Sequence, residues 1–118
     1  MNASFDAPKP EINVFYAKNS VTKDIVTEVT LGIEEEGIPF VVTEKENKNA
    51  RELAYKAAEA SHIGVGIGIS DEVVLHYIKL KGDTPLFAIS SQSNEENLRA
   101  IGSNAGRLMK RMPFRDVE

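Results

Sequence analysis

The chain has 118 residues, of which 42% are hydrophobic and 27% are charged, which is enough for one soluble globular domain with its own core. A formal net charge of −4 argues against non-specific binding to nucleic acid or to an anionic membrane. The sequence has no cysteine, no long apolar run and no signal-like N-terminus, which excludes disulfide frameworks and thiol nucleophiles and favours a cytoplasmic location without membrane attachment.

The beginning of the chain predicts a leader, a strand and a helix. Residues 1–10 contain two prolines and are expected to form a flexible N-terminal leader ahead of a single α/β domain over residues 11–118. Glu11–Ala17 is rich in strand-forming apolar residues and predicts a first strand. A helix is expected over Ser20–Glu36, because its apolar residues recur at helical spacing and define one buried stripe (Val21, Ile25, Val26, Val29 and Ile33).

A second strand and a second helix follow. Phe40–Thr43 predicts a short strand, and Glu44–Lys48 predicts a charged loop. Asn49, with Glu52 three residues later, matches a helix N-cap with a reciprocal acid. This helix is expected to run to about Ala60 and to pack closely on a sheet through a face of small residues and one leucine.

Ile63–Ile69 predicts a third strand with one empty face. Its glycines occupy every second position, so a helix, another backbone or a ligand can approach that face closely (Gly64, Gly66 and Gly68). The spacing does not match the dinucleotide-binding fingerprint, and the sequence has no Walker-type Gly-Lys-Ser/Thr segment. Close helix-on-sheet packing, or the approach of a partner, is therefore favoured over a nucleotide site.

The end of the chain predicts two short strands and a helix. Only three residues lead into Val73–Ile78, so this fourth strand must run antiparallel to the third, and Leu86–Ile89 must run antiparallel to the fourth. The last helix is expected to begin at Ser93, with Glu96 completing a capping box, and to end before Pro113. Six residues are predicted to form its inner face (Leu98, Ile101, Ala105, Leu108, Met109 and Met112). Three basic residues lie near its C-terminal end, where they are interpreted as ordinary capping and solvation (Arg107, Lys110 and Arg111).

Together these elements predict an α/β fold with three α/β/α layers around a five-stranded mixed sheet. Right-handed crossovers favour the strand order 2-1-3-4-5, with strand 4 antiparallel. Such a sheet departs from a pure Rossmann or flavodoxin arrangement.

The acidic stretch Leu31–Phe40 contains the candidate site. Gly37 and Pro39 predict the end of a helix, so three consecutive carboxylates occupy its last turn (Glu34, Glu35 and Glu36). The helix dipole disfavours negative charge there, and such a violation is typical of a functional site, although a merely solvated acidic tip is the alternative. With the apolar stripe facing the core, the roughly 100° between successive helical residues points Glu35 most directly outward.

The candidate site is more consistent with a shared interface than with catalysis. A hard cation prefers about six oxygen ligands, so a single outward carboxylate is best explained as one ligand contributed to a partner's site. His62 and His76 lie far apart in the predicted fold, and His76 is interpreted as a half-buried structural histidine. No serine lies on a nucleophile-elbow motif. The residues alone therefore indicate a small α/β domain that serves as a subunit.

Three segments resemble the small subunit of diol/glycerol dehydratase-reactivating factors. They are Leu31–Phe40 (LGIEEEGIPF), Val73–Tyr77 (VVLHY) with the Pro-Leu-Phe that follows at 85–87, and Ile101–Arg107 (IGSNAGR) with its continuation at 113–116. The Gly-x-Asn-Ala-x-Arg pattern of the last segment also resembles the medium subunit of the adenosylcobalamin-dependent dehydratases themselves.

The resemblance implies a non-catalytic, chaperone-like subunit that helps to reactivate an adenosylcobalamin-dependent diol or glycerol dehydratase. Its expected partner is a large ATPase subunit, in a heterotetramer of two large and two small subunits, so this chain alone is expected to bind neither nucleotide nor cobalamin. On exchange with the dehydratase medium subunit, it is expected to contact the dehydratase large subunit, so that damaged cobalamin is released.

The resemblance also implies a divalent cation, Mg²⁺ or Ca²⁺, at the interface with the large subunit, with Glu35 as the metal ligand from this chain. Two alternatives stay open, a structural subunit of the dehydratase itself and an independent ligand-binding or catalytic α/β domain. The sequence also leaves open whether the complex lies inside a bacterial microcompartment.

Overall fold

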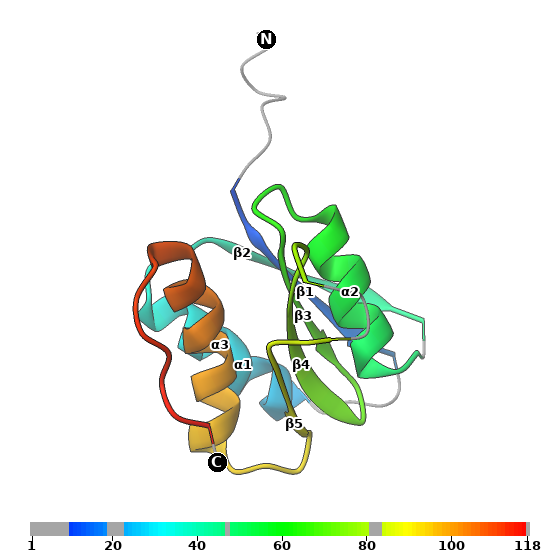
Figure 1. Ribbon diagram of the computed structural model, residues 1–118. Coiled ribbons are helices and arrows are strands. Elements are labelled where there is room, and N and C mark those ends of the chain that lie inside the picture. Colours follow the sequence, from blue (N-terminus) through cyan, green and yellow to red (C-terminus); the bar gives the residue numbers. More distant parts are fainter. Residues whose placement is uncertain (1–9, 19–22, 47, 81–83, 118) are drawn as a thin grey trace, which may run out of the picture.

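A five-stranded mixed sheet with helices on both faces forms the domain in the computed structural model, which describes residues 10–18, 23–46, 48–80 and 84–117 (Figure 1). The elements are β1 Ile12–Ala17, α1 Lys23–Glu35, β2 Phe40–Lys45, α2 Ala50–Ala60, β3 Val65–Ile69, β4 Glu72–Tyr77, β5 Phe87–Ser90 and α3 Glu95–Lys110. The strand order is β2-β1-β3-β4-β5, and β4 is antiparallel to both of its neighbours. The predicted fold class and sheet topology are therefore confirmed.

Two parts of the sequence-based prediction lie outside the described residues. They are the N-terminal leader apart from Pro10, and the expected start of the first helix at Ser20 and Val21. Within the described part of the chain, no helix is long and apolar enough to cross a membrane.

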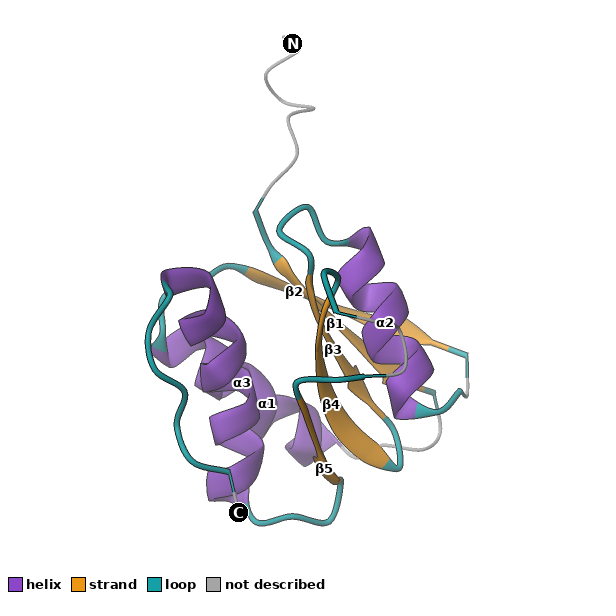
Figure 2. Cartoon of the chain, viewed as in Figure 1, coloured by secondary structure: helices purple, strands orange, loops and turns teal. Residues whose placement is uncertain are grey.

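The three layers follow from the alternation of side chains along each strand. Figure 2 shows α1 and α3 side by side on one side of the sheet and α2 on the other. Ile12 and Val14 of β1 point to the first side and join the main core with buried residues of α1 and α3. Phe15 and Ala17 point to the second side and pack against α2. Each face is thus sealed by a different helix layer, as an α/β/α sandwich requires.

Glycines let the helices approach their neighbours closely. A Cβ atom at Gly66 or Gly68 would clash with the backbone of α2, so the empty strand face predicted from the sequence is filled by that helix. The small residues of α2 form the other side of this contact (Ala50, Ala54, Ala57 and Ala58). The last three belong to the face expected from the sequence, and the structure adds Ala50. On the opposite face, Gly32 of α1 lies against the backbone of α3, and Gly102 of α3 lies against the carbonyl of Val29. This close crossing fixes the end of α1 on α3.

The structure corrects several details at the ends of α3. Asn94, not Ser93, caps the helix, and its side-chain oxygen accepts a hydrogen bond from the backbone N–H of Asn97 at 2.8 Å. The helix stops at Lys110 because Arg111 adopts a left-handed conformation (φ 58°). Met112 therefore lies beyond the helix and is 41% exposed rather than part of the core.

His76 is also more deeply placed than the sequence indicated. It was predicted to be half-buried, and it is almost completely buried on the α2 side of β4. The ring of Tyr55 on α2 covers it, with the two ring centres 5.3 Å apart. Both ring nitrogens lack a hydrogen-bond partner among the described residues.

Candidate functional site

The end of α1 places three consecutive glutamates in three different environments. The helix ends at Glu35, and Gly37 takes the left-handed conformation (φ 75°) while its N–H donates to the carbonyl of Glu34 at 3.0 Å. The predicted glycine stop is confirmed, but Glu36 lies one residue past the helix rather than in its last turn. The turn then rotates Glu36 toward α3 and leaves Glu34 and Glu35 exposed.

Glu36 is an internal ion-pairing residue. Its side chain is only 8% exposed, and its carboxylate lies 2.8 Å from Lys110 Nζ and 3.0 Å from Arg107 Nε. Ser103 Oγ donates a further hydrogen bond at 2.6 Å. The hydrogen bond from Lys110, followed by those from Ser103 and Arg107, lowers the pKa of Glu36 from 4.5 to about 2, although burial opposes the shift. The basic residues at the end of α3 therefore do more than cap the helix, which corrects the sequence-based interpretation.

Glu35 is outward and lies between two arginines. Its side chain is 46% exposed, with one carboxylate oxygen 3.4 Å from Arg115 Nη1 and the other 3.8 Å from Arg99 Nη1. The outward direction agrees with the helical geometry worked out from the sequence. Sequence reasoning missed both arginines, which lie on α3 and on the C-terminal tail.

Two buried or half-buried interactions hold these arginines in place. Glu28 of α1 accepts hydrogen bonds from Arg99 Nη2 at 2.6 Å and Nε at 3.2 Å, and this contact raises the pKa of Arg99 above its usual value. The buried Asn104 binds the backbone of Arg115 twice, because its Nδ2 donates to the carbonyl at 3.0 Å and its Oδ1 accepts from the N–H at 2.6 Å.

These contacts give a physical meaning to the Gly-x-Asn-Ala-x-Arg pattern. Gly102 permits the close crossing of α1, and Asn104 fixes the tail. Ala105 is fully buried in the core, and Arg107 binds both Glu36 and the carbonyl of Pro113, the latter at 3.2 Å. The pattern therefore builds the surface around Glu35 and does not itself form a catalytic set.

The described residues around Glu35 do not form a complete metal site by themselves. Among the described residues, no group of three or more histidine, cysteine, aspartate or glutamate side chains could hold a metal ion. A hard divalent cation prefers about six oxygen ligands, so Glu35 fits such an ion only if water and a second protein supply the remainder.

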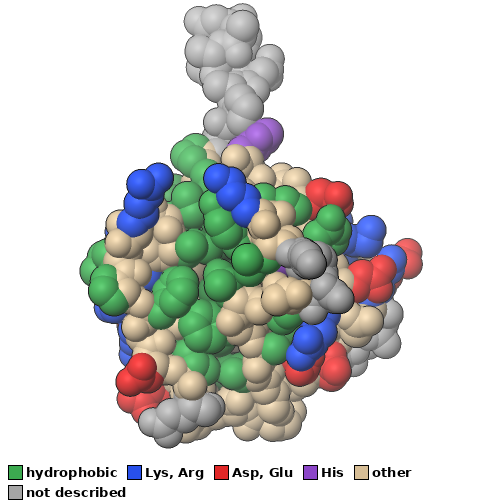
Figure 3. Space-filling view, in the orientation of Figure 1, with side chains coloured by type: hydrophobic (Ala, Val, Ile, Leu, Met, Phe, Trp, Pro, Cys, Tyr) green, Lys and Arg blue, Asp and Glu red, His purple; other side chains and the backbone are tan. Residues whose placement is uncertain are grey.

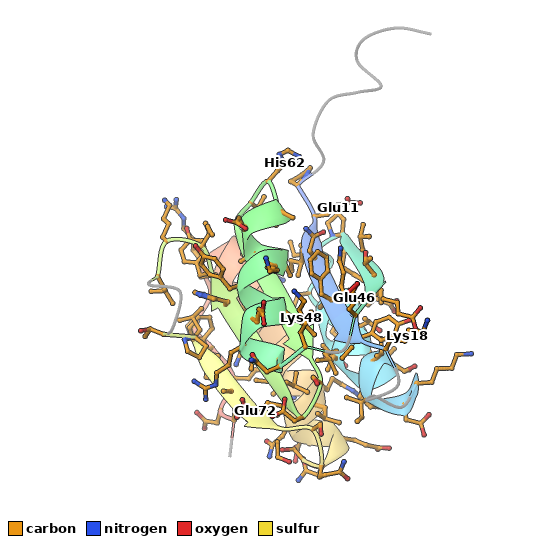
Figure 4. The ribbon with its side chains drawn as sticks, turned by 90° about the vertical axis from the view of Figure 1, so that its right-hand side faces the viewer. Glu11, Lys18, Glu46, Lys48, His62 and Glu72 are labelled. Atoms are coloured by element: carbon orange, nitrogen blue, oxygen red, sulfur yellow. The ribbon has the colours of Figure 1, made fainter. Side chains whose placement is uncertain are left out.

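The two histidines do not form a catalytic site with each other. His62 is exposed on the loop after α2, near Glu11 at one end of the domain (Figure 4), while His76 is buried beneath α2. The two imidazole rings are therefore not brought together in one site.

An open hollow of about 440 Å³ lies between α2 and β2. Its lining residues are Phe15, Lys45, Glu46, Lys48, Leu53, Lys56, Glu59 and Ala60. Lys45 Nζ sits 4.5 Å above the ring of Phe15, and Lys48 pairs with Glu52 at 3.5 Å. Figure 4 shows Glu46 and Lys48 close to each other on this side of the domain. Charges of both signs are interspersed here, so the hollow does not present the convergent polar groups of a small-molecule site.

Hydrophobic side chains gather on the surface between α3 and β5 (Figure 3). Phe114 of the C-terminal tail is 40% exposed and packs edge-on against Phe87 of β5, with ring centres 5.3 Å apart. The exposed Met112 lies two residues earlier on the same tail. Exposed apolar surface of this kind is typical of protein–protein contact.

Comparison with known proteins links this architecture to one group of proteins. The model of the dehydratase medium-subunit family matches residues 9–115. The small subunit of a propanediol dehydratase-reactivating factor from Citrobacter freundii is 46% identical over 94 residues, which cover 79% of this chain and 81% of the relative. The small subunit of the diol dehydratase-reactivating factor from Klebsiella michiganensis is 36% identical over 118 residues, covering 99% of this chain and 91% of the relative.

Chains of solved dehydratase-reactivating factors also superpose on this chain. A chain of a glycerol dehydratase reactivase superposes with a TM-score of 0.85 at 30% identity, covering 93% of this chain and 98% of the other. A chain of a diol dehydratase-reactivating factor complexed with ADP and Mg²⁺ superposes with a TM-score of 0.83 at 36% identity, covering 93% of this chain and 99% of the other.

Proposed function

This chain belongs to the dehydratase medium-subunit family as the small subunit of a dehydratase-reactivating factor, and from that premise we propose that it acts without catalysis, by docking and exchange. Its partner in the resting factor is a large subunit that hydrolyses ATP, in a complex of two large and two small subunits. Support comes from the structural neighbour that is complexed with ADP and Mg²⁺, and from the lack of a Walker-type segment in this sequence.

The observation that carries the exchange proposal is the double likeness of the chain. It matches the family model of a dehydratase medium subunit and also superposes on reactivating-factor chains. A chain with the shape of the medium subunit can take that subunit's place on the dehydratase large subunit. Exchange then depends on the difference between two affinities, and the loosened enzyme releases its damaged cobalamin.

Glu35 is the residue through which we propose that this chain contacts a divalent cation, Mg²⁺ or Ca²⁺, at the interface with the large subunit. Its support is geometric, because the carboxylate is exposed at the tip of α1 and is a single ligand that needs a partner to complete the site. Its neighbour Glu36 is excluded from this role, since two cations and a hydroxyl already occupy its oxygens.

The experiment is co-expression of this chain with the large subunit, followed by a Mg²⁺ titration of complex assembly by analytical ultracentrifugation. We expect Glu35→Gln to weaken cation-dependent assembly while the domain stays folded. Glu34→Gln is the matched control, because Glu34 is an exposed neighbour with the same charge and no ion pair among the described residues. Equal assembly by the wild type and the Glu35 variant at every Mg²⁺ concentration would remove Glu35 from the interface.

Exchange itself is tested with a dehydratase that has been inactivated by glycerol. Labelled small subunit should appear on the dehydratase large subunit, and adenine-lacking cobalamin should be released, when the factor and ATP are added. Stable association with active dehydratase chains and no ATPase partner would instead support the alternative, a structural subunit of the dehydratase, whose medium subunit gives the matching family its description. Turnover of ATP or of a diol by the isolated chain would contradict both proposals.

A further inference from the structure

Arg115 pairs with Glu35 within the chain itself. We propose that Arg115 is a displaceable counter-ion, which holds the Glu35 carboxylate in the free subunit and swings away when that carboxylate meets a divalent cation at the subunit interface. The inference rests on the proposed role of Glu35 and adds to it the regulation of that residue from within the chain.

Both oxygens of Glu35 face a guanidinium. Arg115 Nη1 lies 3.4 Å from one oxygen, and Arg99 Nη1 lies 3.8 Å from the other. A divalent cation that approached this carboxylate would meet two positive charges at close range, and like charges at such a distance repel. At least one guanidinium must therefore move, or be compensated, before the cation can bind.

The two arginines differ in how firmly they are held. Arg99 makes two hydrogen bonds to Glu28, the shorter at 2.6 Å, and the two charges of that pair cancel each other. Arg115 has no carboxylate partner other than Glu35 among the described residues. Its positive charge is therefore the one that neutralises Glu35, and it is the charge whose removal would leave the carboxylate free for a cation.

Arg115 is also able to move without unfolding the tail. Its backbone is fixed by two hydrogen bonds to the buried Asn104, while its side chain is 32% exposed. The neighbouring Phe114 is held separately by its ring contact with Phe87. A change of side-chain rotamer is thus enough to release Glu35, and only one partly exposed ion pair, at 3.4 Å, is lost.

The test is the Mg²⁺ titration of assembly between this chain and the large subunit, carried out with Arg115→Gln at constant ionic strength. An exposed ion pair of ordinary strength corresponds to about a two- to five-fold change in a binding constant. We expect the variant to assemble at a Mg²⁺ concentration lower than the wild type by about that factor. Arg115→Lys, which keeps the charge, should stay close to the wild type.

Arg111→Gln is the matched control, because it removes the same charge from the same tail and Arg111 makes no ion pair among the described residues. Its titration should coincide with that of the wild type. A midpoint for Arg115→Gln that equals or exceeds the wild-type value would overturn the counter-ion role, provided that Glu35→Gln still weakens the Mg²⁺-dependent assembly. If Glu35→Gln leaves the Mg²⁺ dependence intact, the proposed metal ligand itself is wrong, so the two failures are distinguishable.

Discussion

The ion cluster around Glu36 should make a measurable and pH-dependent contribution to stability, which Glu36→Gln is expected to remove. A glutamine at this position has nearly the same shape and can still accept the hydrogen bond from Ser103 through its amide oxygen, but it loses its charge next to Arg107 and Lys110. The substitution therefore isolates the electrostatic part of the cluster.

The magnitude follows from the pKa of Glu36, which the fold lowers from 4.5 to about 2. A tenfold change in proton affinity corresponds to about 1.36 kcal/mol, so the upper bound at pH 7 is about 3.4 kcal/mol. Arg107 and Lys110 are partly exposed, and screening by solvent reduces the expected loss to about 1.5–2.5 kcal/mol. For a domain of this size, such a loss lowers the Tm by roughly 5–10 °C.

The sign of the pH dependence is fixed by the direction of the shift. Since the pKa of Glu36 is lower in the folded state than in the unfolded state, the stabilisation is fully present above pH 4.5 and is lost as the pH falls through 2. Urea unfolding of the wild type and of Glu36→Gln at pH 7, 5, 4 and 3 should show a difference that narrows only at the acid end. The control Glu34→Gln should remain within about 0.5 kcal/mol of the wild type. Equal stability of the wild type and Glu36→Gln at pH 7, or a gap that does not change with pH, would refute this account of the cluster.

Three further variants test the contacts that build the site. Gly102→Ala should destabilise the domain by about 1–3 kcal/mol in urea unfolding, because the new methyl group would clash with the carbonyl of Val29, and an unchanged midpoint would contradict the close helix crossing. Asn104→Ala should lower the free energy of unfolding by about 1–3 kcal/mol and speed amide hydrogen exchange over residues 113–117. Unaltered exchange there would show that Asn104 does not hold the backbone of Arg115. His76→Phe should leave the free energy of unfolding unchanged or raise it by up to about 1 kcal/mol, because both ring nitrogens are buried without partners among the described residues. A loss above about 2 kcal/mol would indicate a hydrogen bond that the described residues do not show.

The sequence was sufficient for the fold because the relevant signals are local. The connection between β3 and β4, three residues by the predicted strand bounds and two in the structure, is too short for a parallel crossover and forces β4 to run antiparallel to β3. The spacing of apolar residues distinguished the helices from the strands. The alternating glycines of β3 predicted a close neighbour, which proved to be α2. The N-cap of α3 was predicted one residue too early. Ser93 and Asn94 are adjacent and both are favourable N-cap residues, so the local pattern does not discriminate between them.

One part of the candidate site could be predicted from the sequence and another part could not. Helical geometry and the glycine stop at Gly37 were enough to predict that Glu35 points outward, because both depend only on residues close along the chain. The partners of the acidic residues are distant in sequence, 71 positions away for the Arg107 contact with Glu36 and 80 for the Arg115 contact with Glu35. No periodicity links such positions. Only the packing of α3 and its tail against α1 decided that Glu36 is neutralised inside the domain while Glu35 stays at the surface, since the energy of an ion pair depends on distances in space and not on separation along the chain.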